Sequence, residues 1–99
     1  MSAKTYNPIQ SDDKFIDIIE FFYQQTGPVT GTQVEKALNM PYGTVMSHIQ
    51  SAVNRKWVRV VNGNQYEIGP RMAGMYSAYK MGLVNRIDSL QRELDTLEA

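Results

Sequence analysis

The 99-residue sequence contains no cysteine and a single histidine. Without cysteine the chain can form neither a disulfide nor a thiolate metal site, and one histidine cannot build a zinc site. A domain this small buries only about 60–65% of its unfolded surface, so its stability needs further support. With disulfides and structural zinc excluded, oligomerisation is the remaining common source of that support.

Long apolar runs are also missing. Residues 1–13 lack the apolar core of a signal peptide, and no segment approaches membrane-spanning length. The sequence has no Gly-rich phosphate loop, no HExxH motif and no nucleophile elbow. We therefore expect a soluble cytoplasmic protein that makes no membrane contact, is not an enzyme, and carries no cofactor or metal.

The net charge is zero, but the charges are unevenly distributed. Residues 1–40 carry three Lys and five Asp or Glu, which gives −2. Residues 41–86 carry six Lys or Arg against Glu67 alone, which gives +5, and residues 87–99 carry one Arg against four acids, which gives −3. A basic middle between acidic ends favours an anionic partner that contacts one part of the molecule.

Residues 1–10 show no periodicity and are predicted to be a flexible arm. Residues 11–69 are predicted to form one domain that begins with a helix capped by Ser11 or Asp12. Gly27 and Pro28 end that helix. Its apolar residues recur at helical spacing and should anchor the core: Phe15, Ile16, Ile18, Ile19, Phe22 and Tyr23.

Two further helices and a hairpin follow. Thr30 and Gln33 have the spacing of a capping box at the start of the second helix, and the third helix is predicted over residues 41–56. Residues 57–61 and 65–68 read as two strands around Asn62-Gly63-Asn64, and Asn-Gly is a strong hairpin signal. The expected fold is mainly α with a small β-hairpin: a winged helix-turn-helix of three helices and a two-stranded wing, followed by a long C-terminal helix.

Residues 70–99 are predicted to be that helix, with a heptad seam that serves dimerisation. The seam could instead fold back on the first helix of the same chain. A parallel pair would place Glu93 opposite the Glu98 of its partner, which is unfavourable, so the antiparallel arrangement also stays open. The residues expected at the dimer interface are Tyr76, Tyr79, Leu83, Ile87, Leu90, Leu94 and Leu97.

Four stretches over about residues 12–80 occur in a familiar order: GPVT at 27–30, VEKALNMPYGTV at 34–45, Trp57-Val58, and YEIGPR at 66–71. Together they resemble the DNA-binding domain of IclR-type transcription regulators, in which GPLT, GLPxSTV and YxLGPR recur in this order. The resemblance implies a winged helix-turn-helix that binds DNA. The effector domain that the family usually adds is not expected here.

The third helix is expected to read the major groove, where short polar side chains on its outer face can bond to base edges. Phosphates need cations and free amides, which the second helix start, the end of the third helix and the wing can supply. No Lys or Arg occurs in residues 42–48. The predicted DNA-binding residues are Thr30, Thr32, Gln33, Tyr42, Gly43, Thr44, Met46, Ser47, Gln50, Arg55, Arg59, Asn62 and Asn64.

His48 falls between Val45 and Ala52 on the inward side of the third helix. We expect a partly buried, hydrogen-bonded histidine there, and a pH switch is the alternative. Trp57 is expected to belong to the core.

The predicted function is sequence-preferring binding of double-stranded DNA by a dimeric transcription regulator, with two recognition helices about one DNA turn apart. The alternative is a winged-helix module that binds a protein partner and binds DNA weakly or not at all. The missing cations of residues 42–48 favour this alternative, and the basic middle segment opposes it.

Overall fold

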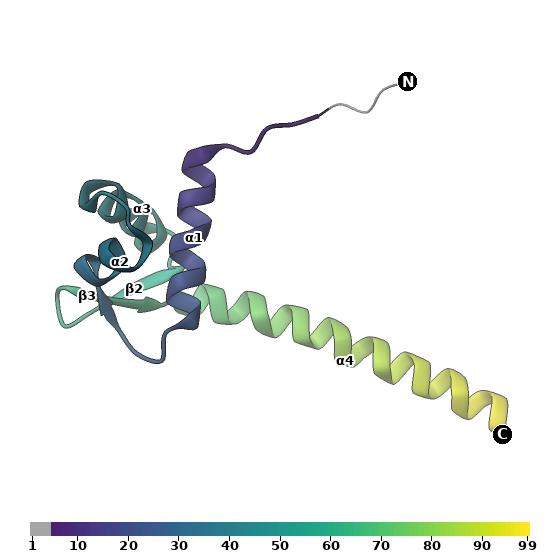
Figure 1. Ribbon diagram of the computed structural model, residues 1–99. Coiled ribbons are helices and arrows are strands. Elements are labelled where there is room, and N and C mark those ends of the chain that lie inside the picture. Colours follow the sequence, from purple (N-terminus) through teal and green to yellow (C-terminus); the bar gives the residue numbers. More distant parts are fainter. Residues whose placement is uncertain (1–4) are drawn as a thin grey trace.

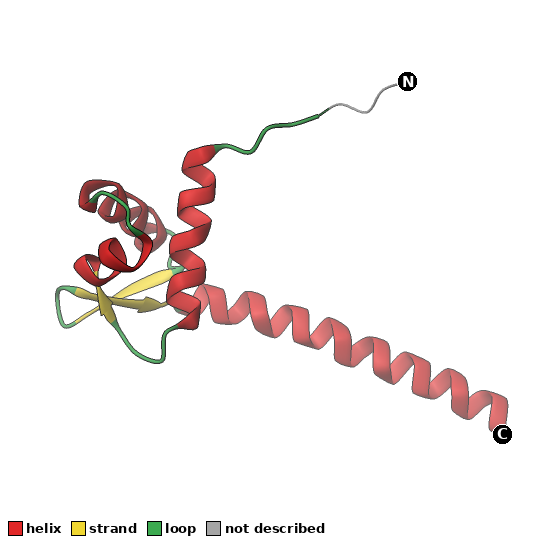
Figure 2. Ribbon diagram, in the orientation of Figure 1, coloured by secondary structure: helices red, strands yellow, loops and turns green. Residues whose placement is uncertain are grey.

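The computed structural model describes residues 5–99 and contains four helices and three short strands within them (Figure 1). The chain is mainly helical, with a small antiparallel sheet and a long C-terminal helix, as the sequence predicted (Figure 2). In chain order the elements are α1 Gln10–Gln24, β1 Val29–Thr30, α2 Gly31–Leu38, α3 Tyr42–Asn54, β2 Val58–Val61, β3 Gln65–Ile68 and α4 Pro70–Glu98.

Helix α1 begins at Gln10, so the predicted cap at Ser11 or Asp12 was wrong. Ile9 is the N-cap, and its side chain makes no capping hydrogen bond. Asp12 and Asp13 instead lie in the first turn, where their negative charge suits the positive end of the helix dipole. The predicted arm overlaps this helix at Gln10, and residues 1–4 of the arm lie outside the described residues.

Helix α2 begins with the capping box that the sequence predicted. Gln33 donates its backbone N–H to Thr30 Oγ1 at 3.2 Å, and its side-chain Oε1 accepts from the Thr30 N–H at 2.7 Å. The helix ends at Leu38, and its C-cap Asn39 has a left-handed φ of 53°, a conformation that asparagine tolerates better than most residues. Local side-chain chemistry therefore sets both ends of this short helix.

Helix α3 is shorter than the predicted 41–56. Pro41 is its N-cap, and the helix ends at Asn54 because Lys56 takes a left-handed φ of 64°. This conformation allows the N–H of Trp57 to donate to the Ala52 carbonyl at 2.9 Å. The chain is thereby turned directly from the helix into strand β2.

The sheet has three strands in the order β1-β3-β2, so the expectation of two strands was wrong. Strands β2 and β3 form the predicted hairpin, and Asn62 and Gly63 at its turn have left-handed φ values of 54° and 83°. On the other edge of β3, Val29 pairs with Tyr66. A strand of two residues has no alternation to detect, so β1 is visible only once β3 lies beside it.

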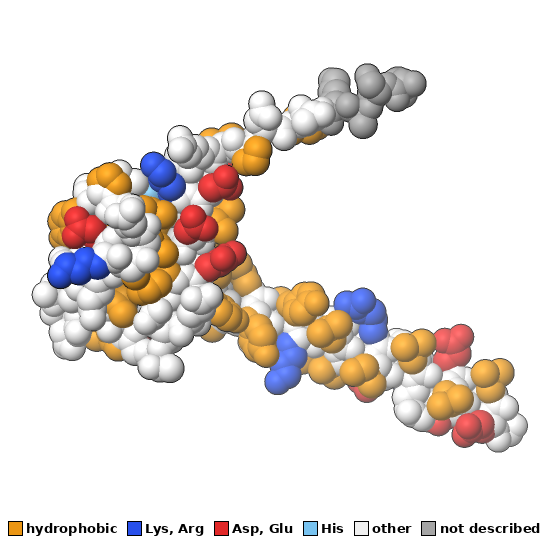
Figure 3. Space-filling view, in the orientation of Figure 1, with side chains coloured by type: hydrophobic (Ala, Val, Ile, Leu, Met, Phe, Trp, Pro, Cys, Tyr) orange, Lys and Arg blue, Asp and Glu red, His pale blue; other side chains and the backbone are white. Residues whose placement is uncertain are grey.

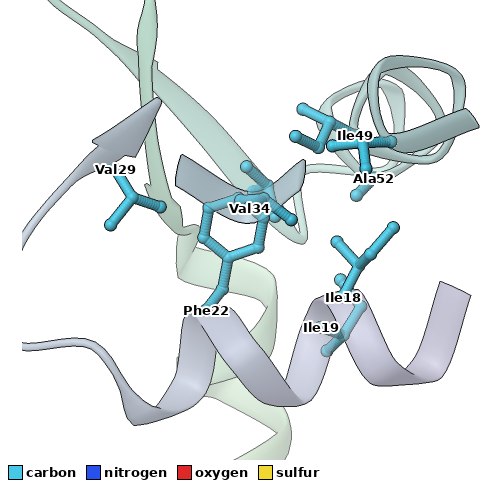
Figure 4. Close-up of a cluster of buried hydrophobic side chains, with 9 residues drawn as sticks. Ile18, Ile19, Phe22, Val29, Val34, Ile49 and Ala52 are labelled. Carbon is cyan, nitrogen blue, oxygen red and sulfur yellow. The ribbon is translucent and has the colours of Figure 1, made fainter. Parts of the chain in front are cut away.

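The core lies between the sheet and helices α1, α2 and α3 (Figure 4). Side chains of α1 point toward those of α2 and α3, and Val29 of β1 closes the other side (Figure 4). Burying each large aliphatic side chain contributes about 1.5–3 kcal/mol. The buried residues are Ile18, Ile19, Phe22, Val29, Val34, Val45, Ile49, Ala52 and Val58.

Gly69 joins this core to α4. Its N–H donates to the Trp57 carbonyl at 2.7 Å, and the Arg71 N–H donates to the Lys56 carbonyl at 3.3 Å. A Cβ atom at Gly69 would lie 2.5 Å from the Lys56 carbonyl oxygen, so the backbones approach more closely than any other residue allows. The start of α4 is thus tied to the end of α3.

Beyond this junction α4 extends away from the rest of the molecule (Figure 1). None of the side chains of Pro70–Glu98 is buried. The radius of gyration is 19.5 Å, against about 13 Å for a compact chain of 100 residues. The alternative in which the seam folds back on α1 is therefore wrong.

Candidate nucleic-acid interface

The outer face of α3 is exposed to solvent and polar. Tyr42, Gly43, Ser47, Gln50 and Asn54 are all exposed on it. The sequence between residues 37 and 66 contains no acidic residue, so no carboxylate of this segment repels an anion. The exposed acidic side chains of α1 line a different surface of the globular part (Figure 3).

Hydrogen bonds hold part of this face in place. Gln50 Nε2 donates to Asn54 Oδ1 at 2.9 Å, one turn further along the helix. Ser51 Oγ donates to the Ser47 carbonyl at 3.2 Å. The amide of Gln50 is therefore oriented along the helix, and a bidentate contact with adenine needs it to exchange Asn54 for the base.

The first turn of α3 packs on the start of α2. Gly31 is buried, and a Cβ atom there would collide with Met46 and would lie 3.2 Å from a ring carbon of Tyr42. Met46 is half-buried and packs against the core. Thr44 is also half-buried. Met46 was predicted to bind DNA from the outer face of α3, and that placement was wrong, because the close approach of the two helices covers much of its side chain.

The start of α2 offers less to a phosphate than its sequence suggests. The capping box occupies the side chains of Thr30 and Gln33 and the Gln33 backbone N–H. Thr32 is exposed and takes no part in the capping box. Its hydroxyl and its backbone amide remain for an anion.

Arg59 is paired with an acid. Its guanidinium lies 2.5 Å from the Glu67 carboxylate, and its Nε donates to the same oxygen at 2.7 Å. The two residues face each other across β2 and β3. Glu67 is the one acidic residue of segment 41–86. Because it pairs with Arg59, it neutralises that arginine rather than another cation of the segment.

Arg55 and Arg71 border an open hollow of about 630 Å³ at the junction of α1, α3 and α4. From the sequence, Arg71 at the end of the YEIGPR stretch could either reach a backbone phosphate or pair with an acid, and it is not among the predicted DNA-binding residues. Folding brings it beside the end of α3 through its bond to Lys56. The other residues that line the hollow are Phe15, Ser51, Asn54, Trp57 and Met75.

The hairpin tip is polar and uncharged. Asn62 and Asn64 are exposed, and Asn62 Nδ2 donates to Gln65 Oε1 at 3.4 Å. Neither side chain carries a charge, so the tip can donate hydrogen bonds to a nucleic-acid backbone without adding an ion pair.

His48 is half-buried on the inner side of α3, as predicted. Its ring lies 5.9 Å from that of Phe15, centroid to centroid, at a tilt of 58°. The predicted hydrogen bond is not among those formed within residues 5–99. Trp57 is half-buried and packs against the core and Phe15, as expected.

The seam of α4 is exposed to solvent along its whole length. Its side chains retain from 39% exposure at Leu83 to 80% at Leu97. Orange apolar side chains run along the length of the helix in Figure 3. The apolar residues predicted for a dimer interface therefore share one long surface that the other residues of 5–99 leave uncovered: Tyr76, Tyr79, Leu83, Ile87, Leu90, Leu94 and Leu97.

Comparison of the chain with known protein families and with curated proteins gives no match in either case. The likeness to IclR-type regulators therefore stays a prediction from the sequence. Among the helices of residues 5–99, none combines the length and the apolar character needed to cross a membrane.

Proposed function

We propose that this chain binds double-stranded DNA as a winged helix-turn-helix protein of the IclR-like kind, and that it regulates transcription as a homodimer joined through α4. Helices α2 and α3 form the helix-turn-helix in this proposal, and the β2–β3 hairpin is the wing. One observation carries it: the exposed face of α3 is polar, lies in a segment without acids, and ends at Arg55 and Lys56.

Some residues of this surface are suited to contact the bases of DNA, and others are suited to contact its phosphates. Ser47 and Gln50 can hydrogen-bond to base edges, and Tyr42 can contact a thymine methyl group. Arg55 and Arg71 suit backbone phosphates, because both are exposed and border the same hollow at the end of α3. Gly43 leaves room for the backbone to approach closely, since nothing lies within 4 Å of a Cβ atom built there.

A second candidate function is binding of a protein partner through the same face. Two observations favour it. The first half of α3 carries no Lys or Arg, and Arg59 is already paired with Glu67. A protein that binds duplex DNA draws much of its affinity from neutralised phosphates, and this face supplies few cations for that purpose.

Salt-dependent binding to duplex DNA separates the two candidates. Fluorescence anisotropy with a labelled duplex of mixed sequence should show binding at low salt that falls steeply as salt rises. The slope of log K against log salt should be about −0.9 for each phosphate neutralised. Replacing Arg55 and Arg71 by alanine should weaken binding to all sequences and make the slope shallower by about 2.

Arg92→Ala is the matched control. Arg92 is an exposed arginine on α4, far along the chain from α3, and its loss should leave the slope unchanged. Absence of binding at low salt, with the protein folded by circular dichroism, would contradict the DNA proposal and favour the protein partner.

A further inference from the structure

The exposed seam of α4 suits a partner that is itself long and narrow. A helix of 29 residues is about 43 Å long, and of the apolar side chains of α4 only that of Met72, in its first turn, packs against the core. Helices in water owe most of their stability to the packing of an apolar face. The seam therefore indicates an occupant that runs along the helix, as a second helix does.

Heptad positions follow from the spacing of the seam. Leu83, Leu90 and Leu97 take the d positions, and Ile87 and Leu94 take the a positions. Extending the pattern toward the N-terminus places Lys80 at a. The flanking g positions are held by Arg86 and Glu93, and the flanking e positions by Val84, Gln91 and Glu98.

Charge is divided along α4. Residues 70–86 carry Arg71, Lys80 and Arg86 without an acid, and residues 87–98 carry four acids and one Arg. Arg86 and Glu93 have no residue of opposite charge three or four positions away. Neither forms an ion pair within the part of the chain that the structure describes. Both charges are thus available to another molecule, at the edge of the apolar seam.

We propose that α4 pairs with α4 of a second copy in antiparallel orientation, with Leu83 opposite the partner's Leu94 and Ile87 opposite the partner's Leu90. In an antiparallel pair, g positions face g positions. This register places Arg86 beside the partner's Glu93 on both sides of the dimer. It also places Lys80 opposite the partner's Leu97, next to the partner's Glu98.

Other arrangements of the same seam bring like charges together. A parallel pair would place Lys80 against the partner's Lys80 and Glu93 against the partner's Glu98. Moving the antiparallel pair by one heptad in either direction would place Arg86 against the partner's Arg86, or Glu93 against the partner's Glu93. Like charges at these positions destabilise the pair, so orientation and register are selected together.

This arrangement specifies the homodimer proposed above and does not depend on DNA binding. Its consequence for DNA rests on the proposed function. In this register the two Pro70 residues lie about 55 Å apart along the helices, at 1.5 Å per residue. One turn of DNA spans about 34 Å. The two α3 helices would then contact half-sites further apart than the single turn expected from the sequence.

Exchange of charges tests the orientation without changing the seam. Glu93→Arg should weaken dimerisation roughly tenfold in sedimentation equilibrium, because Arg86 then faces an arginine. Adding Arg86→Glu should restore wild-type association. In a parallel dimer Glu93→Arg would instead face Glu98 and strengthen association, and that result would overturn the proposal.

Cysteine cross-linking tests the register, since the chain has no cysteine of its own. Under mild oxidation the double variant L83C/L94C should form covalent dimers, whereas L83C and L94C alone should not. Linkage of either single variant would indicate a parallel pair and overturn the proposal. So would failure of the double variant to link, or a wild-type chain that stays monomeric at high concentration. None of these measurements uses DNA, so a failure of the dimer is distinguishable from a failure of DNA binding.

Discussion

Arg59 and Glu67 face each other across β2 and β3, with the guanidinium 2.5 Å from the carboxylate. The positive charge of Arg59, which was predicted to contact DNA, is therefore balanced by the carboxylate of Glu67. Arg59→Ala should reduce affinity for duplex DNA by less than about twofold, whereas Arg55→Ala should reduce it about fivefold, the equivalent of ~1 kcal/mol. Anisotropy titrations at one fixed salt concentration measure both.

The same substitution also tests what the ion pair contributes to the fold. The Arg59 side chain is 64% exposed, and exposed pairs contribute at most ~1 kcal/mol. Urea unfolding of Arg59→Ala should therefore show only a small loss of stability. A fall in DNA affinity that matches or exceeds that of Arg55→Ala would show that Arg59 leaves Glu67 to contact DNA.

Gln50→Ala should change sequence preference rather than general affinity. Gln50 is exposed on α3, and a bidentate amide contact with adenine is worth about 1–3 kcal/mol of discrimination. Selection from a random duplex pool should show relaxed preference at one base pair. Gln91→Ala, at an exposed glutamine of α4, is the matched control, and equal effects of the two changes would argue against α3 as the reading helix.

Ile18→Ala should destabilise the protein by about 2–5 kcal/mol in urea unfolding, because Ile18 is fully buried among α1, α2 and α3. Ile16 lies on the same helix but is 50% exposed. Ile16→Ala removes the same atoms and should cost much less. Similar losses for the two variants would mean that the exposed side of α1 is covered in solution.

Gly69→Ala should destabilise the junction between the core and α4 by about 1–3 kcal/mol, because the new Cβ would collide with the Lys56 carbonyl oxygen. Gly74 lies within α4 with nothing within 4 Å of a Cβ atom. Gly74→Ala should instead stabilise the helix by up to about 1 kcal/mol. Thermal unfolding should therefore show a lower midpoint temperature for Gly69→Ala and a higher one for Gly74→Ala. An unchanged midpoint for Gly69→Ala would mean that the junction can open to admit the new methyl group.

Leu90→Asp should convert the proposed dimer to monomer in sedimentation, because it places a carboxylate in the middle of the seam. Ser89→Asp adds the same charge to the neighbouring position, away from the seam residues, and should leave the dimer intact. Both residues are exposed in the single chain, so neither change should disturb the core. A dimer that survives Leu90→Asp would mean that another surface holds it.

Features that depend on neighbours along the chain could be predicted from the order of residues alone. The Thr30–Gln33 capping box, the Asn62-Gly63 turn and the apolar spacing of α1 each involve residues within about one or two helical turns, so their patterns are visible before folding. The same holds for Tyr42, Ser47 and Gln50 on the outer face of α3, which remain exposed once the inward stripe is subtracted, but not for Met46, which packs against the core. The break after Asn54 was missed because it depends on the left-handed turn at Lys56 and on the strand that follows.

Contacts between segments that are far apart in the sequence depend on how the whole chain folds. The pairing of β1 with β3 and the cover that Gly31 allows over Met46 join segments whose proximity no local pattern encodes. The tertiary fold also directs α4 away from α1, so the apolar seam of α4 stays exposed. A heptad pattern states that a helix has an apolar face, and the path of the chain after Gly69 determines whether that face meets its own core or another molecule.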